Sequence, residues 1–309
     1  MPVSNQNKEE TQGFVQRFLF EGLDIRGAFV RLDQCWQAMQ AGRMYAPPVA
    51  RLLGEMAAVT ALIGGQMKQE GRLTFQLRGP GAIKRLVMDC NESLQMRGMA
   101  HADLQVADLP VPELLGAARG GQLMLSLDLP SAKQPYQSYV PLVGDSVAAI
   151  FEYYLEQSEQ QPSRLFLQSS DQAACCLFLQ KLPAAAEKDA DGWDRISHLA
   201  GTVKPEELLG LMPDQLLMRL FHEEMEQGGI RLFDPRPVSY YCPEDWEKVR
   251  GMLRSLGQAE AEAILSEHGE ILILDDICNR EYRFSAADVA ELFSPSAMAA
   301  ATSGGPTLH

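Results

Sequence analysis

The sequence is short of the features that mark nucleic-acid-binding, membrane-spanning and exported proteins. Lysine and arginine number 27 against 41 aspartate and glutamate residues, which leaves a net charge of −14. That charge opposes binding to nucleic acid and to anionic membranes, because both need clustered cations on the protein. The most apolar stretch, residues 49–67, is interrupted by Arg51, Glu55 and Thr60 and is not expected to span a bilayer. We therefore expect neither a nucleic-acid partner nor a membrane partner.

Cysteine is also scarce, and the six that occur do not form the dense pattern of a secreted disulfide framework. The first ten residues lack the charged-then-apolar layout of a secretory signal, so we expect a cytoplasmic protein with free, metal-bound or redox-responsive thiols. Cys35 and Cys90 are expected to be small buried apolar residues. Cys175 and Cys176 adjoin in one predicted strand, so their side chains point to opposite faces, which disfavours a redox pair.

No arrangement of residues predicts a catalytic site. The five histidines lack the spacing of metal ligands. Residues 79–81 read Gly-Pro-Gly, but no Gly-Lys-Ser or Gly-Lys-Thr follows, so this is a turn rather than a phosphate-binding loop. Because no nucleophile, base and acid form a recognisable set, we expect a protein that is not an enzyme and that binds no nucleotide.

What the sequence does contain is a main domain of mixed pattern in residues 1–183. Apolar positions recur at helical spacing after Pro47-Pro48, and proline suits the first turn of a helix. Elsewhere apolar and polar residues alternate, which is typical of half-buried strands. The expected strands are residues 73–77, 83–88, 94–99, 123–129, 136–142, 164–167 and 176–182. The pattern predicts an α+β fold, in which this N-terminal mixed α/β domain contains an antiparallel sheet.

Three further segments follow the main domain. Residues 184–229 carry short helices with narrow apolar stripes, so we expect a helical linker that docks on the main domain and is able to undock. Residues 230–293 predict a small C-terminal module, which needs a metal, a disulfide or docking for stability. Residues 294–309 are rich in small residues and proline, which predicts a disordered tail.

The C-terminal module contains two cysteines that we expect to lie close in space. Cys242 stands at the entry to a helix that we expect Pro243 to open, and Cys278 stands in a turn. Glu244 accompanies the first cysteine and Asp275 the second, so each loop offers zinc a thiolate and a carboxylate. Thiolates hold zinc better than carboxylates, so binding would be weak. Alternatively, the two carboxylates serve only a first helical turn and a strand-to-strand turn.

Short motifs also occur in a characteristic order over most of the chain. They are Arg17-Phe18-Leu19-Phe20-Glu21, Gln95-Met96-Arg97-Gly98, Gly144-Asp145, Arg219-Leu220-Phe221-His222-Glu223-Glu224, Cys242-x-Glu244 and Asp275-x-x-Cys278-Asn279. Each is modestly specific, but their order and spacing are highly specific. In these motifs the chain resembles the heat shock protein 33 family. The family has Cys-x-Cys and Cys-x-x-Cys in the last two, where this sequence has Glu244 and Asp275 in place of the second and third cysteines.

The resemblance implies an ATP-independent holdase chaperone that binds unfolding client proteins under oxidative or heat stress. In the family, a reduced, zinc-bound C-terminal domain keeps the linker folded. Oxidation forms two disulfides, releases zinc and unfolds the linker, and a homodimer then captures clients. Here each cysteine pair has lost one thiol, so neither of those disulfides forms, and a Cys242–Cys278 bond remains as the redox candidate. A second possibility is a zinc-free domain held by packing, and a third is a domain loose enough for the chaperone to be active when reduced. Our hypothesis is weak or absent zinc at this site, with partly relaxed redox control.

Two other functions are alternatives. A thiol-disulfide oxidoreductase would use Cys175 and Cys176, or Cys242 and Cys278, and would need an exposed thiol of low pKa. A binding protein for one dedicated partner would engage a single client in fixed stoichiometry. The absence of a catalytic motif and the docking linker favour the holdase interpretation.

Overall fold

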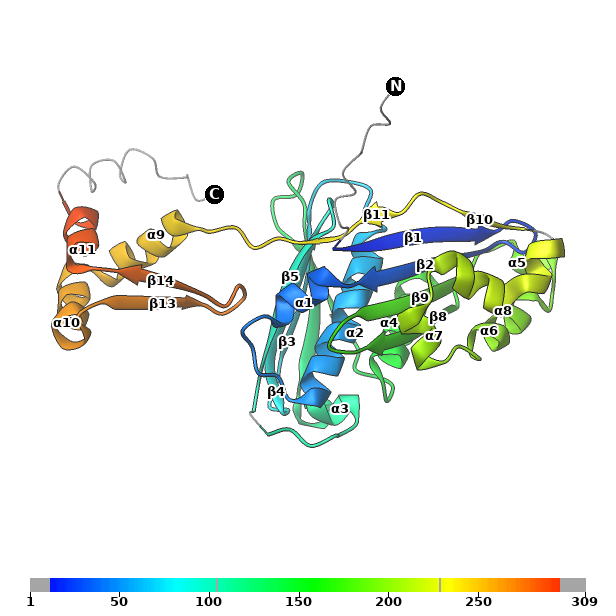
Figure 1. The fold of residues 1–309 in the computed structure, drawn as a ribbon, viewed down its shortest axis with the longest axis horizontal. Helices are drawn as coiled ribbons and strands as arrows, with labels where there is room; N and C mark the ends of the chain where they lie inside the picture. Colours follow the sequence, from blue (N-terminus) through cyan, green and yellow to red (C-terminus); the bar gives the residue numbers. More distant parts are fainter. Residues whose placement is uncertain (1–11, 104, 228, 295–309) are drawn as a thin grey trace, which may run out of the picture. The chain divides into compact units, whose positions relative to one another are not determined.

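The computed structural model describes residues 12–103, 105–227 and 229–294. Apart from Ser294, the tail expected at residues 294–309 lies outside these described residues. The described residues form two compact units, which divide between Tyr241 and Cys242. The α+β fold class predicted from the sequence is confirmed (Figure 1).

The first unit is built on two sheets, which we name sheet A and sheet B. Sheet A has the strand order β10-β1-β2-β9-β8, with β11 also paired to β1. Its pairings are antiparallel. Its strands are β1 (Gly13–Phe20), β2 (Ile25–Leu32), β8 (Ser163–Ser169), β9 (Ala174–Lys181), β10 (Ile230–Leu232) and β11 (Arg236–Pro237).

Sheet B has the order β12-β5-β4-β3-β6-β7 and is antiparallel except for the parallel pair β12–β5. Phe75 on β3 lies opposite Leu125 on β6, and both side chains are buried. Their neighbours along each strand are more exposed, so the alternation seen in the sequence is the alternation between core and surface. The strands are β3 (Arg72–Arg78), β4 (Ile83–Asn91), β5 (Gln95–Ala102), β6 (Gln122–Asp128), β7 (Tyr136–Val140) and β12 (Ser239–Tyr240).

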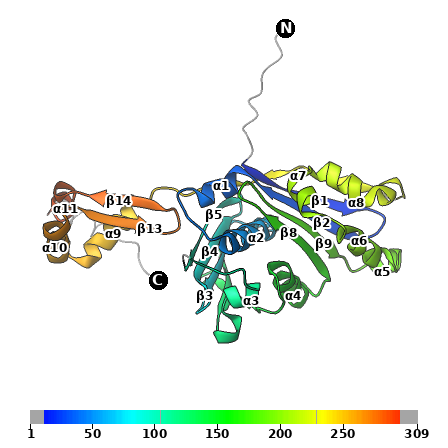
Figure 2. The same ribbon diagram turned by 60° about the horizontal axis from the view of Figure 1, so that its bottom comes forward.

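Helix α2 (Pro47–Gly64) is the centre of the main core and contacts strands of both sheets (Figure 2). It begins with two prolines, as expected, because proline lacks the N–H that a first turn leaves unpaired. Thirteen of its 18 residues are buried, so it packs over most of its circumference rather than along one stripe. The other helices of this part are α1 (Gln34–Gln40), α3 (Val111–Leu114), η1 (Ala117–Arg119) and α4 (Val147–Glu159).

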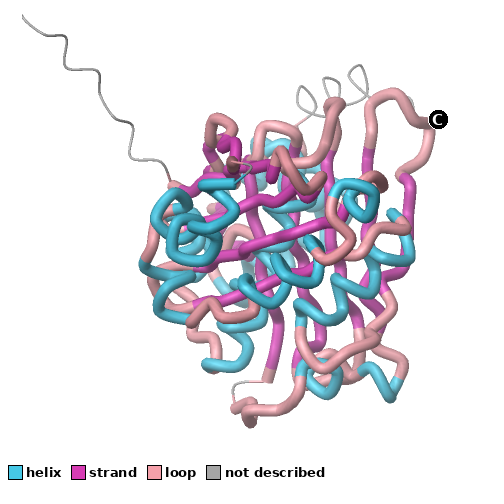
Figure 3. Tube along the Cα trace, turned by 90° about the vertical axis from the view of Figure 1, so that its right-hand side faces the viewer, coloured by secondary structure: helices cyan, strands magenta, loops and turns pink. Residues whose placement is uncertain are grey.

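The linker helices cover the opposite face of sheet A (Figure 3). There a second core forms, in which Trp193, Leu216 and Phe221 pack with the sheet residues Phe18 and Phe20. The docking of narrow apolar stripes on the main domain is therefore confirmed. The helices are α5 (Ala185–Lys188), α6 (Gly192–Ala200), α7 (Pro205–Gly210) and α8 (Pro213–Gln227).

The second unit begins later than expected. The sequence pattern predicts a boundary before residue 230, whereas the two compact units divide after Tyr241. The reason is backbone pairing: β10 and β11 pair with β1, and β12 pairs with β5, so residues 230–241 belong to the sheets of the first unit.

The C-terminal unit is a hairpin surrounded by helices with its own small core. Pro243 does not open its first helix as expected, because Asp245 is the N-cap and its side chain accepts a hydrogen bond from the backbone N–H of Lys248 at 3.0 Å. Val249, Tyr282 and Phe284 are buried in the core. The elements are α9 (Trp246–Leu256), α10 (Gln258–His268), β13 (Ile271–Asp275), β14 (Arg280–Phe284) and α11 (Ala286–Leu292).

Candidate functional site

Cys242 and Cys278 lie together in the C-terminal unit. Cys242 precedes α9, and Cys278 lies in the turn between β13 and β14. The structure joins them in a disulfide with a Cα–Cα distance of 5.9 Å, inside the range of such bonds. Asn279 follows in the left-handed conformation (φ 51°), which asparagine tolerates and which turns the chain back into β14. The expected proximity of the two cysteines is therefore present.

The two carboxylates predicted beside them are engaged by the protein itself. Glu244 accepts a hydrogen bond from the indole N–H of Trp246 at 2.8 Å and lies 3.8 Å from the guanidinium of Arg280. Asp275 accepts backbone hydrogen bonds from Ile277 at 2.9 Å and Cys278 at 3.3 Å, which close the hairpin turn. The turn position expected for Asp275 is found, whereas Glu244 lies before the helix and not in its first turn.

Aromatic packing holds the same region from the other side. The Trp246 ring lies 4.8 Å from that of Tyr282 and 5.7 Å from that of Phe284, each edge-on. The hydroxyl of Tyr282 accepts a hydrogen bond from the backbone N–H of Asp245 at 3.0 Å. Packing and the disulfide thus connect the start of α9 to the hairpin.

A second functional region is the interface between the linker and sheet A. Phe221 on α8 stacks edge-on against Phe20 on β1, with ring centroids 5.1 Å apart. Phe221 has non-helical dihedral angles (φ −131°, ψ 31°), so α8 is kinked where it meets the sheet. The linker therefore hides aromatic side chains that would face water if it undocked.

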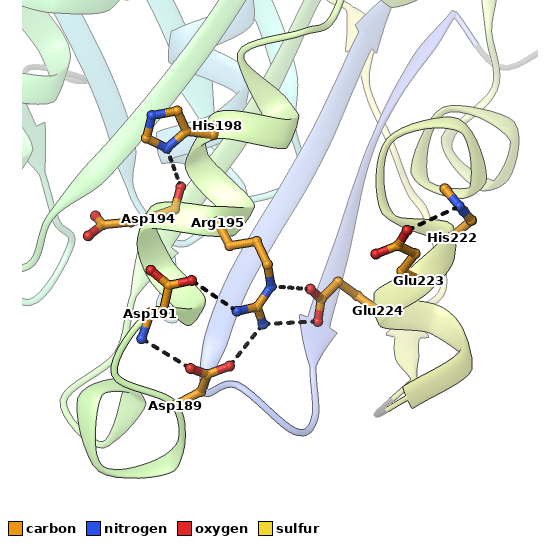
Figure 4. A network of polar contacts seen from close by, with 8 residues as sticks. All are labelled: Asp189, Asp191, Asp194, Arg195, His198, His222, Glu223 and Glu224. Carbon is orange, nitrogen blue, oxygen red and sulfur yellow. Dashed lines mark hydrogen bonds and ion pairs between the residues drawn. The ribbon is translucent and has the colours of Figure 1, made fainter.

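A polar cluster accompanies this apolar interface (Figure 4). The guanidinium of Arg195 on α6 donates to Glu224 on α8 at 2.6 Å and to Asp189 at 2.9 Å, and lies 3.5 Å from Asp191. Glu224 and Asp189 raise the pKa of Arg195, and the hydrogen bond from Arg195 lowers the pKa of Asp189. We name Arg195, Asp189, Asp191 and Glu224 the linker clamp. Sequence reasoning missed it, because Arg195 and Glu224 are 29 positions apart.

Known proteins share the sequence and the fold described above. The family described as Hsp33 protein matches residues 13–285. The chain belongs to the Hsp33 family. A 33 kDa chaperonin of Chromobacterium violaceum is 41% identical over 288 residues, which cover 93% of this chain and 96% of that protein. One of Azotobacter vinelandii is 40% identical over 288 residues, which cover 91% and 94%.

A solved structure shares the fold. The 33 kDa chaperonin of Thermotoga maritima superposes with a TM-score of 0.73 at 24% identity, over 91% of this chain and 97% of that one. The resemblance to the heat shock protein 33 family drawn from the sequence motifs is confirmed, and membership of the Hsp33 family identifies the chain as a chaperone. Within the described residues, no helix has both the length and the apolar character needed to cross a membrane.

Zinc is the metal that the Hsp33 resemblance implies at the C-terminal cysteines, and the residues do not fit it as placed. Both thiols are used by the disulfide, and the carboxylates of Glu244 and Asp275 are turned to Trp246, Arg280 and the backbone. In the part of the chain that the structure describes, no three histidine, cysteine, aspartate or glutamate side chains are grouped to hold a metal ion.

The other cysteines of this Hsp33-family chain are buried and free. Cys175 faces the linker core and Cys176 the main core, so the expected opposite faces are confirmed. Burial raises the pKa of Cys175 and of Cys90 to about 12, and also raises those of Cys176 and Cys35. A buried thiol that stays protonated is a poor nucleophile, so these four residues offer no site for thiol-disulfide exchange.

Proposed function

We propose that this Hsp33-family chaperone is an ATP-independent holdase, which binds unfolding proteins and prevents their aggregation under oxidative or heat stress. The observation that carries the proposal is the apolar face held beneath the linker. Phe18, Phe20 and Phe29 of sheet A are covered by four short helices, α5 to α8. When these helices undock, the uncovered face offers unfolded clients an apolar surface without requiring a shaped pocket.

The linker is suited to undocking because its helices depend on the sheet. Helix α5 has four residues and α7 has six. Isolated helices shorter than about 12–15 residues are marginal in water, so α5 and α7 lose their helical structure when the linker leaves the sheet. An unfolded segment beside an apolar face adapts to many partners.

The redox control we propose is simpler than a switch with two disulfides. The Cys242–Cys278 bond is its redox element, and the neighbouring carboxylates serve the polypeptide rather than zinc. We therefore propose weak or absent zinc binding and a partly relaxed dependence on oxidation. In keeping with the resemblance, we propose that the active form is a cytoplasmic homodimer.

Light scattering from a heat-unfolding client tests this function. The full chain is assayed fully reduced and after oxidant treatment, beside Cys242→Ser and Cys278→Ser, which remove the same bond from opposite sides. We expect the wild type to suppress aggregation in at least one state. Suppression only after oxidation, lost in both variants, assigns the switch to this bond; suppression in both states means that activity is free of redox control. No suppression in either state overturns the holdase proposal and favours a single dedicated partner.

A further inference from the structure

A cationic pocket lies in the first unit, between the C-terminal end of α2 and sheet A. Its volume is about 410 Å³, within the range of small-molecule sites. Apolar side chains of the main core line its inner wall, among them Val15, Leu62 and Phe178. The pocket therefore combines an apolar wall with an open mouth.

Four cations line the same pocket: Arg17, Arg26, Lys68 and Arg236. Among the described residues, no aspartate or glutamate is part of its lining. This is unexpected for a chain that carries 41 acidic residues against 27 basic ones. The lining of this pocket therefore carries positive charge without a carboxylate of its own.

Two of these cations are held in place. Arg236 donates to the carbonyl oxygens of Gly65 at 2.9 Å and Glu92 at 2.7 Å. Arg26 donates to the Gln180 side chain at 2.7 Å, and its Nη2 lies 3.3 Å from Glu159 at the surface. Guanidinium groups fixed in this way are preorganised, because their planar donors do not lose further freedom when an anion binds.

The other two cations have no carboxylate partner. Over the residues that the structure describes, neither Arg17 nor Lys68 forms an ion pair; Arg17 lies against the ring of Phe233, 5.7 Å from its centroid. Both side chains are exposed at the mouth. Cations near a helix C-terminus also complement its dipole. Arg236 already does so through Gly65, whereas Arg17 and Arg26 lie on strands, so the dipole does not account for them.

We propose that this pocket binds a small organic anion, a phosphate or carboxylate carried on an apolar group. Arg17 and Lys68 supply charge-assisted hydrogen bonds to the anionic group, and the wall formed by Val15, Leu62 and Phe178 receives the apolar part. The site is independent of the holdase proposal, because it lies on the face of sheet A opposite the linker.

A bound anion also connects segments that lie far apart in the sequence. Arg17 and Arg26 come from β1 and β2, Lys68 follows α2, and Arg236 comes from β11, after the linker. An anion held by all of them stabilises the folded first unit over the unfolded chain, so it raises the melting temperature.

Isothermal titration and thermal unfolding of the full chain test the site, with phenyl phosphate and inorganic phosphate as probes at low ionic strength. The double variant Arg17→Gln/Lys68→Gln removes the unpaired charges. Arg119→Gln/Lys133→Gln is the matched control, since it makes the same change in net charge at exposed positions outside the pocket lining. Lys68→Gln alone is a milder variant at a single exposed side chain.

We expect one phenyl phosphate per chain, bound more tightly than inorganic phosphate because of the apolar wall. The pocket double variant should weaken binding about tenfold or more, the single variant less, and the control double variant not measurably. The wild-type melting temperature should rise with phenyl phosphate and that of the pocket variant should not. Absence of saturable binding of both probes to the wild type, or equal weakening in the pocket and control variants, overturns the proposal.

Discussion

Replacing Arg195 by leucine tests whether the linker clamp holds the linker on sheet A. The change removes the hydrogen bonds to Glu224 and Asp189 and leaves a shorter, apolar side chain on α6. Glu224 keeps a carboxylate whose side chain is only 9% exposed. We therefore expect the free energy of docking to fall, because a buried charge without its partner is costly.

The expected loss of docking free energy follows from how deeply the Arg195–Glu224 ion pair is buried. Removing one partner of a fully buried ion pair costs about 3–5 kcal/mol. The Arg195 side chain is 34% exposed, so solvent screens part of the interaction, and we expect about 2 kcal/mol. That loss corresponds to about thirtyfold faster amide exchange by local opening of α6 and α8. The reduced variant should also suppress client aggregation more strongly than the reduced wild type.

Hydrogen–deuterium exchange with mass spectrometry measures this opening segment by segment. Arg219→Leu is the matched control: Arg219 pairs with Glu207 at 3.0 Å on the same linker, but it is more exposed, so its loss should cost less than about 1 kcal/mol. Arg195→Leu/Glu224→Leu should recover much of the lost protection, because it removes the unpaired charge as well. Unchanged exchange in α6 and α8 of Arg195→Leu would refute the reasoning.

Three further predictions concern the disulfide, Glu55 and zinc. Reducing the Cys242–Cys278 bond opens a loop with a sequence separation of 36 and should destabilise the C-terminal unit by about 3–4 kcal/mol, as measured by calorimetry with and without reductant. Burial raises the pKa of Glu55 to about 7, so the folded state binds this proton more tightly than the unfolded chain, and stability should fall as pH rises from about 4.5 to about 7. Glu55→Gln should remove this fall and exceed wild-type stability by about 2 kcal/mol at about pH 8, as measured by urea unfolding. Elemental analysis of the reduced, desalted protein should find well under one zinc per chain.

Each of these three predictions has an outcome that contradicts it. Equal melting of the C-terminal unit in both redox states would mean that packing around Trp246 and Tyr282 suffices without the bond. A wild-type stability profile that stays flat over the titration range, matching that of Glu55→Gln, would mean that Glu55 keeps an ordinary pKa. One tightly held zinc per chain would show that Glu244 and Asp275 leave their present partners to bind the metal.

Local sequence patterns were sufficient to predict many of the helices and strands of the main domain. The alternation of Leu73, Phe75 and Leu77 predicted β3, because one face of a half-buried strand must be apolar. The adjacency of Cys175 and Cys176 predicted opposite faces, because side chains alternate along any strand. The narrow stripes of the linker predicted docking, since short helices of this kind have no core of their own. The proximity of Cys242 and Cys278 was predictable chiefly from the order of motifs over the chain.

Tertiary structure alone decided which distant partners meet. Residues 230–241 joined the first unit because Leu232 pairs with Phe18 and Tyr240 with Met96, and three short strands carry too little local pattern to reveal such partners. Arg195 pairs with Glu224, out of 41 acidic residues in the chain, because α6 and α8 pack against each other. The cationic pocket also depends on tertiary structure, because its charged residues come from separate strands and from the end of a helix. Short-range periodicity indicates which side of a helix or strand is buried. Ion pairs and pockets depend instead on how helices and strands pack together, and this packing is set by the whole core.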